Sequence, residues 1–332
     1  MKGKWQKTGL KSPICVTWEI TAKCNLHCKH CLSSSVAFTH DELSLEEAMA
    51  LIDHIVEMEV FYINIGGGEP FLREDVFDII AYTDKKKLPI QLSTNGTLVN
   101  EETAAFLSKI KDIRIQVSLD GASALVNDSI RGDGSFAGAL KALQLLSSRG
   151  IELSINFVVT SKNFQELESC YRLAREYKAV FRVSRLRPSG QARRIYEEYH
   201  LSTEQHRQLY YWLKKHPDVS TGDSFFFLSV LGKSLFSMNS CGAATMTCSI
   251  GPNGDVYPCA FLMDREKAGN IRREQLADIW RNSGMFKNFR SKTIPECLNC
   301  NHFATCGGGC RAVSFYYSGE FFKRDPECLI FS

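Results

Sequence analysis

The sequence reads Thr21-Ala-Lys-Cys24-Asn-Leu-His-Cys28-Lys-His-Cys31 directly after a short apolar run, which places three thiols within eight residues. The spacing is C-x3-C-x2-C, and no fourth cysteine follows closely. Cysteine thiolates are the usual protein ligands of iron–sulfur clusters. Four close cysteines would complete the ligation of a four-iron cluster, whereas three leave one iron open, in the way that catalytic metal sites keep a vacant position. A small zinc site or a chance spacing is the alternative interpretation.

The composition is that of an ordinary globular protein. The chain has 332 residues, 44% of them hydrophobic and 23% charged, which is enough for one large domain and a smaller one. The net charge of +3 is too small to predict nucleic acid or an anionic membrane as a partner. We expect neither a signal peptide nor a membrane span, because the lysines near the start precede no long apolar run. Thirteen cysteines without a secretory signal therefore predict metal ligation in a reducing cytoplasm rather than disulfides.

Strand and helix patterns alternate between residues 14 and 216. We predict strands at 14–20, 61–65, 89–93, 113–119, 151–159 and 180–186, followed by helices at 44–59, 74–86, 100–110, 135–149, 164–177 and 203–215. Ser44 and Glu47 have the spacing of a capping box at the first helix. Repeated βα units form parallel sheets with right-handed crossovers. The six units predict either a doubly wound sheet or a curved, incomplete barrel.

The ends of five predicted strands carry small, polar or cysteine residues. They are residues 21–31 (called the cysteine loop below), Gly67-Gly68-Glu69-Pro70, Ser93-Thr94-Asn95-Gly96, Ser118-Leu119-Asp120-Gly121 and Arg185-Leu186-Arg187-Pro188. In parallel α/β folds, ligands bind at the carboxyl ends of the strands. Any one of these segments is also consistent with a simple turn. Five together predict a ligand site at this edge of the sheet.

These motifs resemble the radical S-adenosylmethionine (SAM) family. The resemblance is carried by the cysteine loop after the first strand, by residues 67–70 after the second and by residues 118–121 after the fourth. It implies a partial (β/α)6 TIM-type barrel at 14–216, preceded by an N-terminal tail at 1–13. It also implies a [4Fe–4S] cluster on Cys24, Cys28 and Cys31 whose open iron binds SAM. Reductive cleavage of SAM would then give methionine and a 5′-deoxyadenosyl radical that abstracts hydrogen from a substrate.

The family pattern further implies which residues bind SAM: His30, Gly67, Gly68, Glu69, Pro70, Ser93, Asn95, Ser118, Arg131 and Leu186. The glycines would let the backbone approach a ligand closely, and the carboxylate of Glu69 would hold the methionyl ammonium. Ser93, Asn95 and Ser118 offer hydrogen bonds to the ribose or the methionyl carboxylate. Arg131 is expected to pair with that carboxylate, with a surface salt bridge as the alternative. His30 is expected near the adenine.

Eight further cysteines lie beyond residue 240, where regular periodicity fades. They resemble the SPASM extension of the same family, so we expect a connector at 217–240 and a SPASM domain at 241–332. The resemblance implies two auxiliary [4Fe–4S] clusters, hence three in all, with interleaved ligands: Cys241, Cys248, Cys259 and Cys310 for cluster I, and Cys297, Cys300, Cys306 and Cys328 for cluster II. Two four-cysteine zinc sites are the alternative. We expect the remaining Cys15 and Cys170 to be buried free thiols.

Within this family the chain resembles the mycofactocin maturases, through residues 31–35, 60–70, 185–190 and 221–226. Those enzymes decarboxylate the C-terminal tyrosine of a small precursor peptide oxidatively and then join valine and tyrosine carbons with a second SAM. The resemblance therefore implies a ribosomally made precursor peptide as substrate. An auxiliary cluster would accept the extra electron of the decarboxylation. Arg185 and Arg187 are the candidate substrate-binding residues, with arginines that merely face solvent as the alternative.

The sequence also bears on partners. Anaerobic sulfatase maturases place an aspartate after the cysteine that matches Cys259, where this chain has Ala260, so their proposed general base is absent. Only 13 residues precede the first predicted strand, and we therefore expect a separate small leader-peptide-binding chain. An electron donor such as flavodoxin or ferredoxin is also expected. Two other functions stay open. One is a radical SAM/SPASM enzyme that acts on another peptide or on a small cofactor precursor such as a porphyrin. The other is a non-catalytic iron–sulfur electron carrier or zinc-stabilised scaffold.

Overall fold

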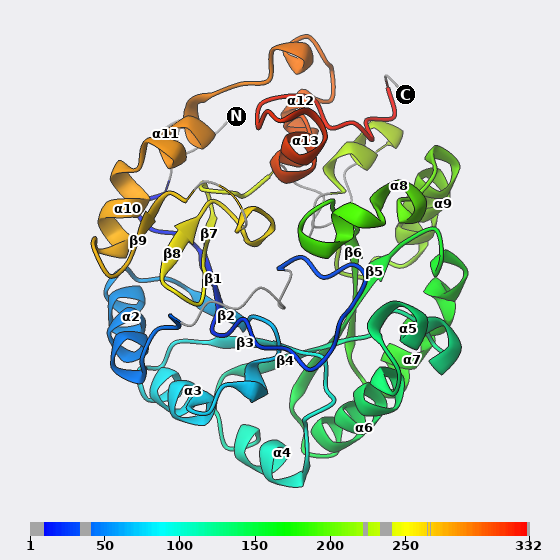
Figure 1. Cartoon of the computed structure of the whole chain (residues 1–332). Coiled ribbons are helices and arrows are strands. Elements are labelled where there is room, and N and C mark those ends of the chain that lie inside the picture. Colours follow the sequence, from blue (N-terminus) through cyan, green and yellow to red (C-terminus); the bar gives the residue numbers. More distant parts are fainter. Residues whose placement is uncertain are drawn as a thin grey trace.

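The computed structural model describes residues 10–33, 41–221, 225–232, 241–263, 265 and 267–330. Most of the predicted tail, part of the predicted connector, and parts of the stretches 31–35 and 221–226 lie outside these residues. Figure 1 shows a ring in which strands line the middle and helices lie outside them. The C-terminal third of the chain completes this ring.

Six parallel strands run in chain order around the ring. They are β1 (Cys15–Glu19), β2 (Tyr62–Gly66), β3 (Ile90–Thr94), β4 (Ile113–Ser118), β5 (Glu152–Val159) and β6 (Val180–Arg185). A doubly wound sheet reverses its strand order at one point, whereas the order β6-β5-β4-β3-β2-β1 has no reversal. The structure therefore confirms the incomplete barrel.

Helices cover the outside of these strands (Figure 1). They are α2 (Leu45–Glu57), α3 (Val76–Lys85), α4 (Glu101–Leu107), α5 (Ala124–Arg131), α6 (Ser135–Ser147), α7 (Leu167–Glu176) and α9 (Thr203–Lys215), with the short α8 (Tyr196–Tyr199) before α9. The predicted capping box is present, since Ser44 and Glu47 each accept a hydrogen bond from the other's backbone N–H. Six of these helices match predicted ones, whereas α5 and the short α8 were not predicted.

The two faces of the barrel strands differ in polarity. Side chains alternate between the faces of a strand, and the outward ones, such as Trp18, Ile63 and Leu92, are completely buried in one hydrophobic core beneath the helices. The inward ones are polar, as Asn64 and Ser93 illustrate. The barrel therefore has an apolar outer side that stabilises the fold and a polar inner side that is suited to a ligand.

The sheet continues past β1. The strand β7 (Thr247–Ile250) pairs parallel with β1, and β8 (Asp255–Tyr257) and β9 (Gly269–Asn270) follow it antiparallel. Segments of four, three and two residues are too short to show a period of two, which explains why the sequence predicted no strand here. The predicted second domain thus extends the sheet of the first, giving nine strands in one sheet.

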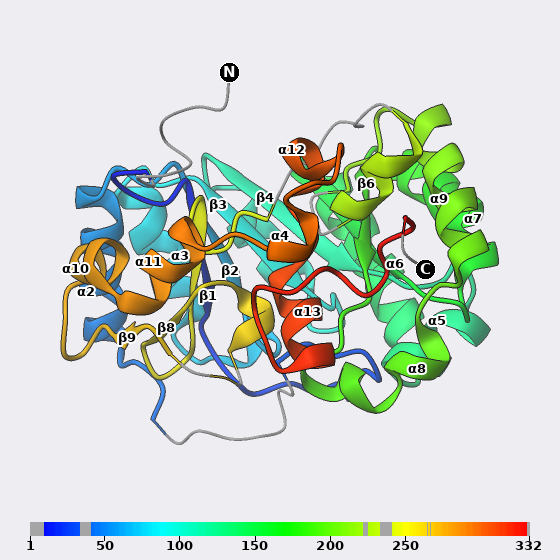
Figure 2. The same cartoon turned by 90° about the horizontal axis from the view of Figure 1, so that it is seen from above.

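The last third of the chain crosses between the two edges of the sheet. Its helices are α10 (Leu276–Asn282), α11 (Gly284–Ser291), α12 (Phe303–Cys306) and α13 (Arg311–Ser318). Figure 2 shows α12 and α13 between the β7–β9 side and the β6 side of the ring. There α12 contacts the turn η4 (Phe226–Leu231). None of the helices in the described part of the chain combines the length and apolar character needed to cross a membrane.

Candidate cluster and SAM site

The cysteine loop leaves the end of β1 and is held against the end of β2. The backbone N–H of Gly68 donates to the Thr21 carbonyl (2.8 Å), and that of Glu69 donates to the Lys23 carbonyl (2.8 Å). A Cβ at Gly68 would lie 2.1 Å from the Lys23 carbonyl oxygen, so only glycine permits this contact. The glycine pair was expected to approach a ligand. In the structure, its close neighbour is the cysteine loop itself.

Glu69 links the end of β2 to the end of β3. Its carboxylate is fully buried and accepts hydrogen bonds from the Thr94 hydroxyl (2.8 Å) and from the backbone N–H groups of Asn95 (2.8 Å) and Phe71 (3.3 Å). Burial raises the pKa of this carboxyl to about 7, although these donors favour the ionised form. The expectation that the carboxylate reaches the methionyl ammonium is therefore not supported, because protein donors surround it. Pro70 follows as the first residue of a short 3₁₀ turn, η1 (Pro70–Leu72).

Asp120 joins the cysteine loop to the barrel wall. This fully buried carboxylate contacts His30 Nε2 and Arg131 Nε (2.6 Å for the latter) through Oδ2, and Oδ1 accepts from the Val158 N–H (2.7 Å). Burial raises the pKa of the Asp120 carboxyl, but the charges of Arg131 and His30 outweigh it and hold the pKa below its usual value. A carboxylate that binds both predicted SAM residues fixes their positions. Sequence reasoning missed this role, although Asp120 stands in the 118–121 motif.

Arg131 connects this ion pair to a cluster cysteine. Its Nη1 lies 3.9 Å from Cys28 Sγ, and the Lys29 N–H donates to the Ile130 carbonyl (2.9 Å). The guanidinium is buried beside the loop, so the alternative of a surface salt bridge does not apply. The structure thus brings Arg131, His30 and the cysteine loop together.

The other predicted SAM residues lie in two places. The Asn95 side chain donates to Asn25 Oδ1 in the cysteine loop (2.9 Å). Ser93 accepts a hydrogen bond from a glutamine of β4 (3.1 Å), and Ser118 ends β4 half-buried on the same inner face. Leu186, in contrast, packs in a small separate apolar cluster beyond β6. The first three stand at the predicted edge, whereas Leu186 contributes to that separate cluster.

The loop cysteines suit a cluster rather than free thiolates. Burial raises the pKa of Cys28 to about 11, and the nearby Arg131 charge acts against this shift. Burial likewise raises the pKa of Cys24. Thiols must lose their protons to bind metal, and metal binding drives this loss. The three half-buried cysteines with one buried cation beside them therefore fit a cluster that carries net negative charge.

All four cysteines assigned to auxiliary cluster II come together. Cys297, Cys300, Cys306 and Cys328 line one pocket near α12, together with His302, Arg324 and Asp325. Electrostatic interaction with Cys328 raises the pKa of both Cys297 and Cys306, after the larger effect of burial. Two of the four belong to a C-x2-C pair and one lies 22 residues after Cys306, so the fold supplies the convergence that the spacing only suggested.

Only three of the four cysteines assigned to auxiliary cluster I come together. Cys241 and Cys310 both raise the pKa of Cys259, after the effect of burial. Cys248 lies elsewhere: it is in β7 opposite Val16, on the side that faces the hydrophobic core. Its electrostatic neighbours are Cys15 and Arg290. The assignment of Cys248 to this set is therefore corrected, because the pleat of β7 turns its thiol into the core.

Arg185 and Arg187 were the predicted substrate residues, and both are buried. The Arg185 guanidinium binds Asp325 through two hydrogen bonds of 2.8 Å and Glu327 at 2.7 Å. Arg187 stacks over the Phe261 ring at 3.5 Å, next to the cluster I cysteines. The prediction for Arg185 is corrected, because two protein carboxylates already bind its guanidinium.

Comparison with known proteins agrees with this geometry. Residues 18–174 match the radical SAM superfamily, and residues 241–301 match the iron–sulfur cluster-binding SPASM domain. Mycofactocin maturase MftC from Mycolicibacterium smegmatis is 43% identical over 97% of this chain and 84% of its own length. The chain belongs to the radical SAM superfamily. As a radical SAM enzyme with a SPASM domain, it uses SAM and binds iron–sulfur clusters, which confirms the expected class.

Two further comparisons concern the fold and the alternative function. Streptococcus suis SuiB, in a crystal structure with its precursor peptide SuiA, matches this radical SAM chain with a TM-score of 0.83, covering 97% of this chain and 77% of SuiB. At 20% identity the likeness shows a shared fold alone. The AdoMet-dependent heme synthase of Methanosarcina barkeri is 30% identical over 96% of this chain and 97% of its own length, a weaker similarity than that to MftC.

Proposed function

We propose that this radical SAM enzyme is a maturase of a ribosomally made precursor peptide, and that it acts in mycofactocin biosynthesis. The observation that carries the proposal is the 43% identity to MftC along 97% of the chain. An identity of this level that includes both the barrel and the SPASM domain supports a shared substrate more strongly than any single motif. The reaction would be oxidative decarboxylation of a C-terminal tyrosine, followed by joining of valine and tyrosine carbons.

The residues of the cysteine loop would hold the reactive centre. Cys24, Cys28 and Cys31 would bind a [4Fe–4S] cluster, and SAM bound to it supplies the hydrogen-abstracting radical. Asp120 holds Arg131 and His30 in place around this centre. The close contact between Gly68 and the Lys23 carbonyl, called the clamp below, fixes the start of the loop. These contacts would keep the centre rigid and partly shielded from water, as a reactive radical requires.

The auxiliary clusters of the C-terminal region would accept the extra electron that the oxidative decarboxylation releases. We propose three clusters in total, with Cys297, Cys300, Cys306 and Cys328 for auxiliary cluster II and with Cys241, Cys259 and Cys310 for cluster I. The division into a barrel at 14–216, a connector at 217–240 and a SPASM domain at 241–332 is part of this proposal. The proposal also includes three further expectations: a flavodoxin or ferredoxin as electron donor, a separate leader-peptide-binding chain, and a reducing cytoplasmic setting.

The test is an incubation of the reconstituted, reduced enzyme with SAM and a precursor peptide that ends in Val-Tyr. We expect 5′-deoxyadenosine and a product lighter by about 44–46 mass units, the loss of CO2 and hydrogen. Cys28→Ala should abolish SAM cleavage while the auxiliary iron remains. Cys170→Ala, which changes a buried thiol of α7, is the matched control and should retain activity. SAM cleavage with an unchanged peptide would contradict the proposal.

A second candidate substrate is a porphyrin-like cofactor precursor, favoured by the 30% identity to the heme synthase of M. barkeri. The same incubation with an iron porphyrin in place of the peptide distinguishes the two. We expect no change in the porphyrin, whereas its decarboxylation, together with an unmodified peptide, would favour this second function. About twelve irons per chain in either case would support three four-iron clusters.

A further inference from the structure

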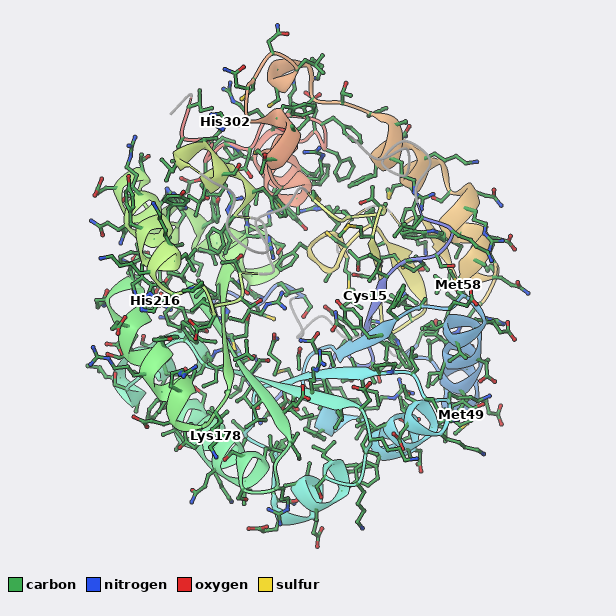
Figure 3. All side chains as sticks on the ribbon, turned by 180° about the vertical axis from the view of Figure 1, so that it is seen from behind. Cys15, Met49, Met58, Lys178, His216 and His302 are labelled. Carbon is green, nitrogen blue, oxygen red and sulfur yellow. The ribbon has the colours of Figure 1, made fainter. Side chains whose placement is uncertain are left out.

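Glu19 is the last residue of β1 and lies on the inner face of the barrel. Its neighbour Trp18 is completely buried in the core beneath the helices, and side chains alternate along a strand, so Glu19 faces the opposite side. Cys15 and Thr17 share that side, and Asn64 of β2 reaches both, at 3.2 and 3.4 Å. Figure 3 shows Cys15 toward the inside of the ring.

The carboxylate of Glu19 has no partner within the part of the chain that the structure describes. The residue is 7% exposed, and neither a hydrogen bond nor an ion pair reaches its side chain. Opposite it on β2 stands Gly66, where an added Cβ would meet no atom within 4 Å. Asn64 therefore donates hydrogen bonds to Cys15 and Thr17, the earlier inward-facing residues of β1. Glu19 instead faces Gly66, which has no side chain to offer a hydrogen bond.

A largely buried carboxylate without a protein donor keeps only the hydration that reaches its small exposed part, which is unfavourable. Burial raises the pKa of Glu19 to about 7, and no charge among the described residues offsets this effect. A carboxyl group in this state readily accepts a hydrogen bond from a ligand that approaches it. A hydrogen-bond donor on a bound ligand would therefore stabilise this carboxylate.

The position of Glu19 relates its carboxylate to the proposed reactive centre. Thr21, two residues later, begins the cysteine loop, and the Ile20 N–H still donates to the Gly66 carbonyl (3.0 Å). The carboxylate therefore lies at the barrel edge where the reactive centre would stand. A substrate residue that loses a hydrogen atom there must place its own side chain beside this edge.

We propose that Glu19 is a positioning residue that accepts a hydrogen bond from the phenol O–H of the substrate tyrosine. This inference rests on the proposed function and names how the reacting side chain is held. Of the side-chain and terminal groups of a C-terminal Val-Tyr, the phenol is the hydrogen-bond donor. The terminal carboxylate, in contrast, is repelled by an ionised Glu19. Gly66 has no side chain, and an added Cβ there would meet no atom within 4 Å, so the facing residue of β2 does not block this approach.

The test measures binding of two precursor peptides, one ending in Val-Tyr and the other in Val-Phe, to the reconstituted holoenzyme. We expect the wild type to bind the tyrosine peptide about tenfold more tightly or better, as a hydrogen bond to a charged group permits. Glu19→Leu removes the acceptor at similar size and should bind the two peptides equally. Glu57→Gln, which changes an exposed glutamate at the end of α2, is the matched control and should keep the wild-type preference.

Three results would overturn the inference. Equal binding of the two peptides by the wild type does so, and so does a tyrosine preference that persists in Glu19→Leu; in both cases the proposed function stands, because the peptide still binds. Should Glu19→Leu fail to fold, Glu19→Gln keeps the volume and a neutral acceptor, and we expect its preference to fall several-fold. An unchanged preference in that variant also overturns the inference. If the wild type binds and modifies neither peptide, the proposed function fails together with it.

Discussion

Glu19 and Glu69 are two buried carboxyl groups on neighbouring strands, and their surroundings give them different roles. Burial raises the pKa of both to about 7. Glu69 receives three hydrogen bonds from the protein, so it stabilises the barrel edge. Glu19 receives none from the described residues, so its carboxylate is available to a ligand. The pKa therefore does not distinguish these two carboxyl groups, whereas the presence or absence of protein hydrogen-bond donors around each of them does.

The raised pKa of Glu19 predicts how stability depends on pH. Its folded-state pKa of about 7 lies above the ordinary value of 4.5, so between these values the folded state holds a proton that the unfolded state has lost. This contribution to the free energy of unfolding is fully present below pH 4.5 and disappears as the pH rises through 7; it amounts to roughly 3 kcal/mol at most. We expect Glu19→Gln to lose less stability than the wild type between about pH 5.5 and 8, by urea denaturation. Parallel pH profiles for the two proteins would contradict this.

The sequence predicts candidate metal ligands better than their surroundings. Spacing predicted the three loop cysteines, and the resemblance to the SPASM extension predicted the C-x2-C pair of cluster II, because cluster ligation requires cysteines in fixed local patterns. The role of Asp120 depends on contacts across the fold, since His30 and Arg131 come from other segments. The error at Cys248 has the same origin, because only the pairing of β7 with β1 shows which way its thiol points.

At the scale of elements, the barrel strands were predicted to within about one residue of their ends because their outward side chains repeat with a strict period of two. The unpredicted helix α5 illustrates the limit of prediction from apolar periodicity. Its buried residues are Asn127, Ile130 and Arg131, so two of the three are polar and no apolar stripe marks the helix. Polar side chains thus make up most of the buried side of α5, and Asn127 and Arg131 pair there with Ser135 and Asp120.

The clamp between the cysteine loop and residues 67–69 predicts a specific defect in Gly68→Ala. The new methyl group is fixed directly to the backbone of residue 68 and would lie 2.1 Å from the Lys23 carbonyl oxygen. Neither atom can rotate away, so the start of the loop must move. We expect loss of SAM cleavage and a fall in iron content by about one third of the proposed three clusters. Gly284→Ala, where an added Cβ meets nothing within 4 Å, should keep full iron and activity. Full iron with normal SAM cleavage in Gly68→Ala would contradict the role of the clamp.

At the scale of the whole molecule, one buried ion-pair network joins the end of the barrel to the auxiliary cysteines. Arg185 at the end of β6 binds Asp325 and Glu327, and Asp325 also accepts from the Cys310 N–H (2.9 Å). Cys310 is a proposed ligand of cluster I, and Cys328, a proposed ligand of cluster II, follows Asp325 by three residues, so the two proposed auxiliary sites meet here. Arg185 and Asp325 are 140 residues apart in the chain, and no local pattern indicates such a contact.

This network predicts that Arg185→Gln weakens the closure of the ring. Removing one partner leaves buried carboxylates without their counter-charge, which costs about 3–5 kcal/mol in comparable buried pairs. We expect faster backbone hydrogen exchange over residues 320–330 and loss of cluster II iron, because Cys328 loses its anchor. Arg175→Gln, which breaks the exposed pair with Asp218, is the matched control and should cost less than about 1 kcal/mol. If the two variants are equally stable and exchange alike, the C-terminal segment is held by its cysteines alone and Arg185 regains its candidacy as a substrate residue.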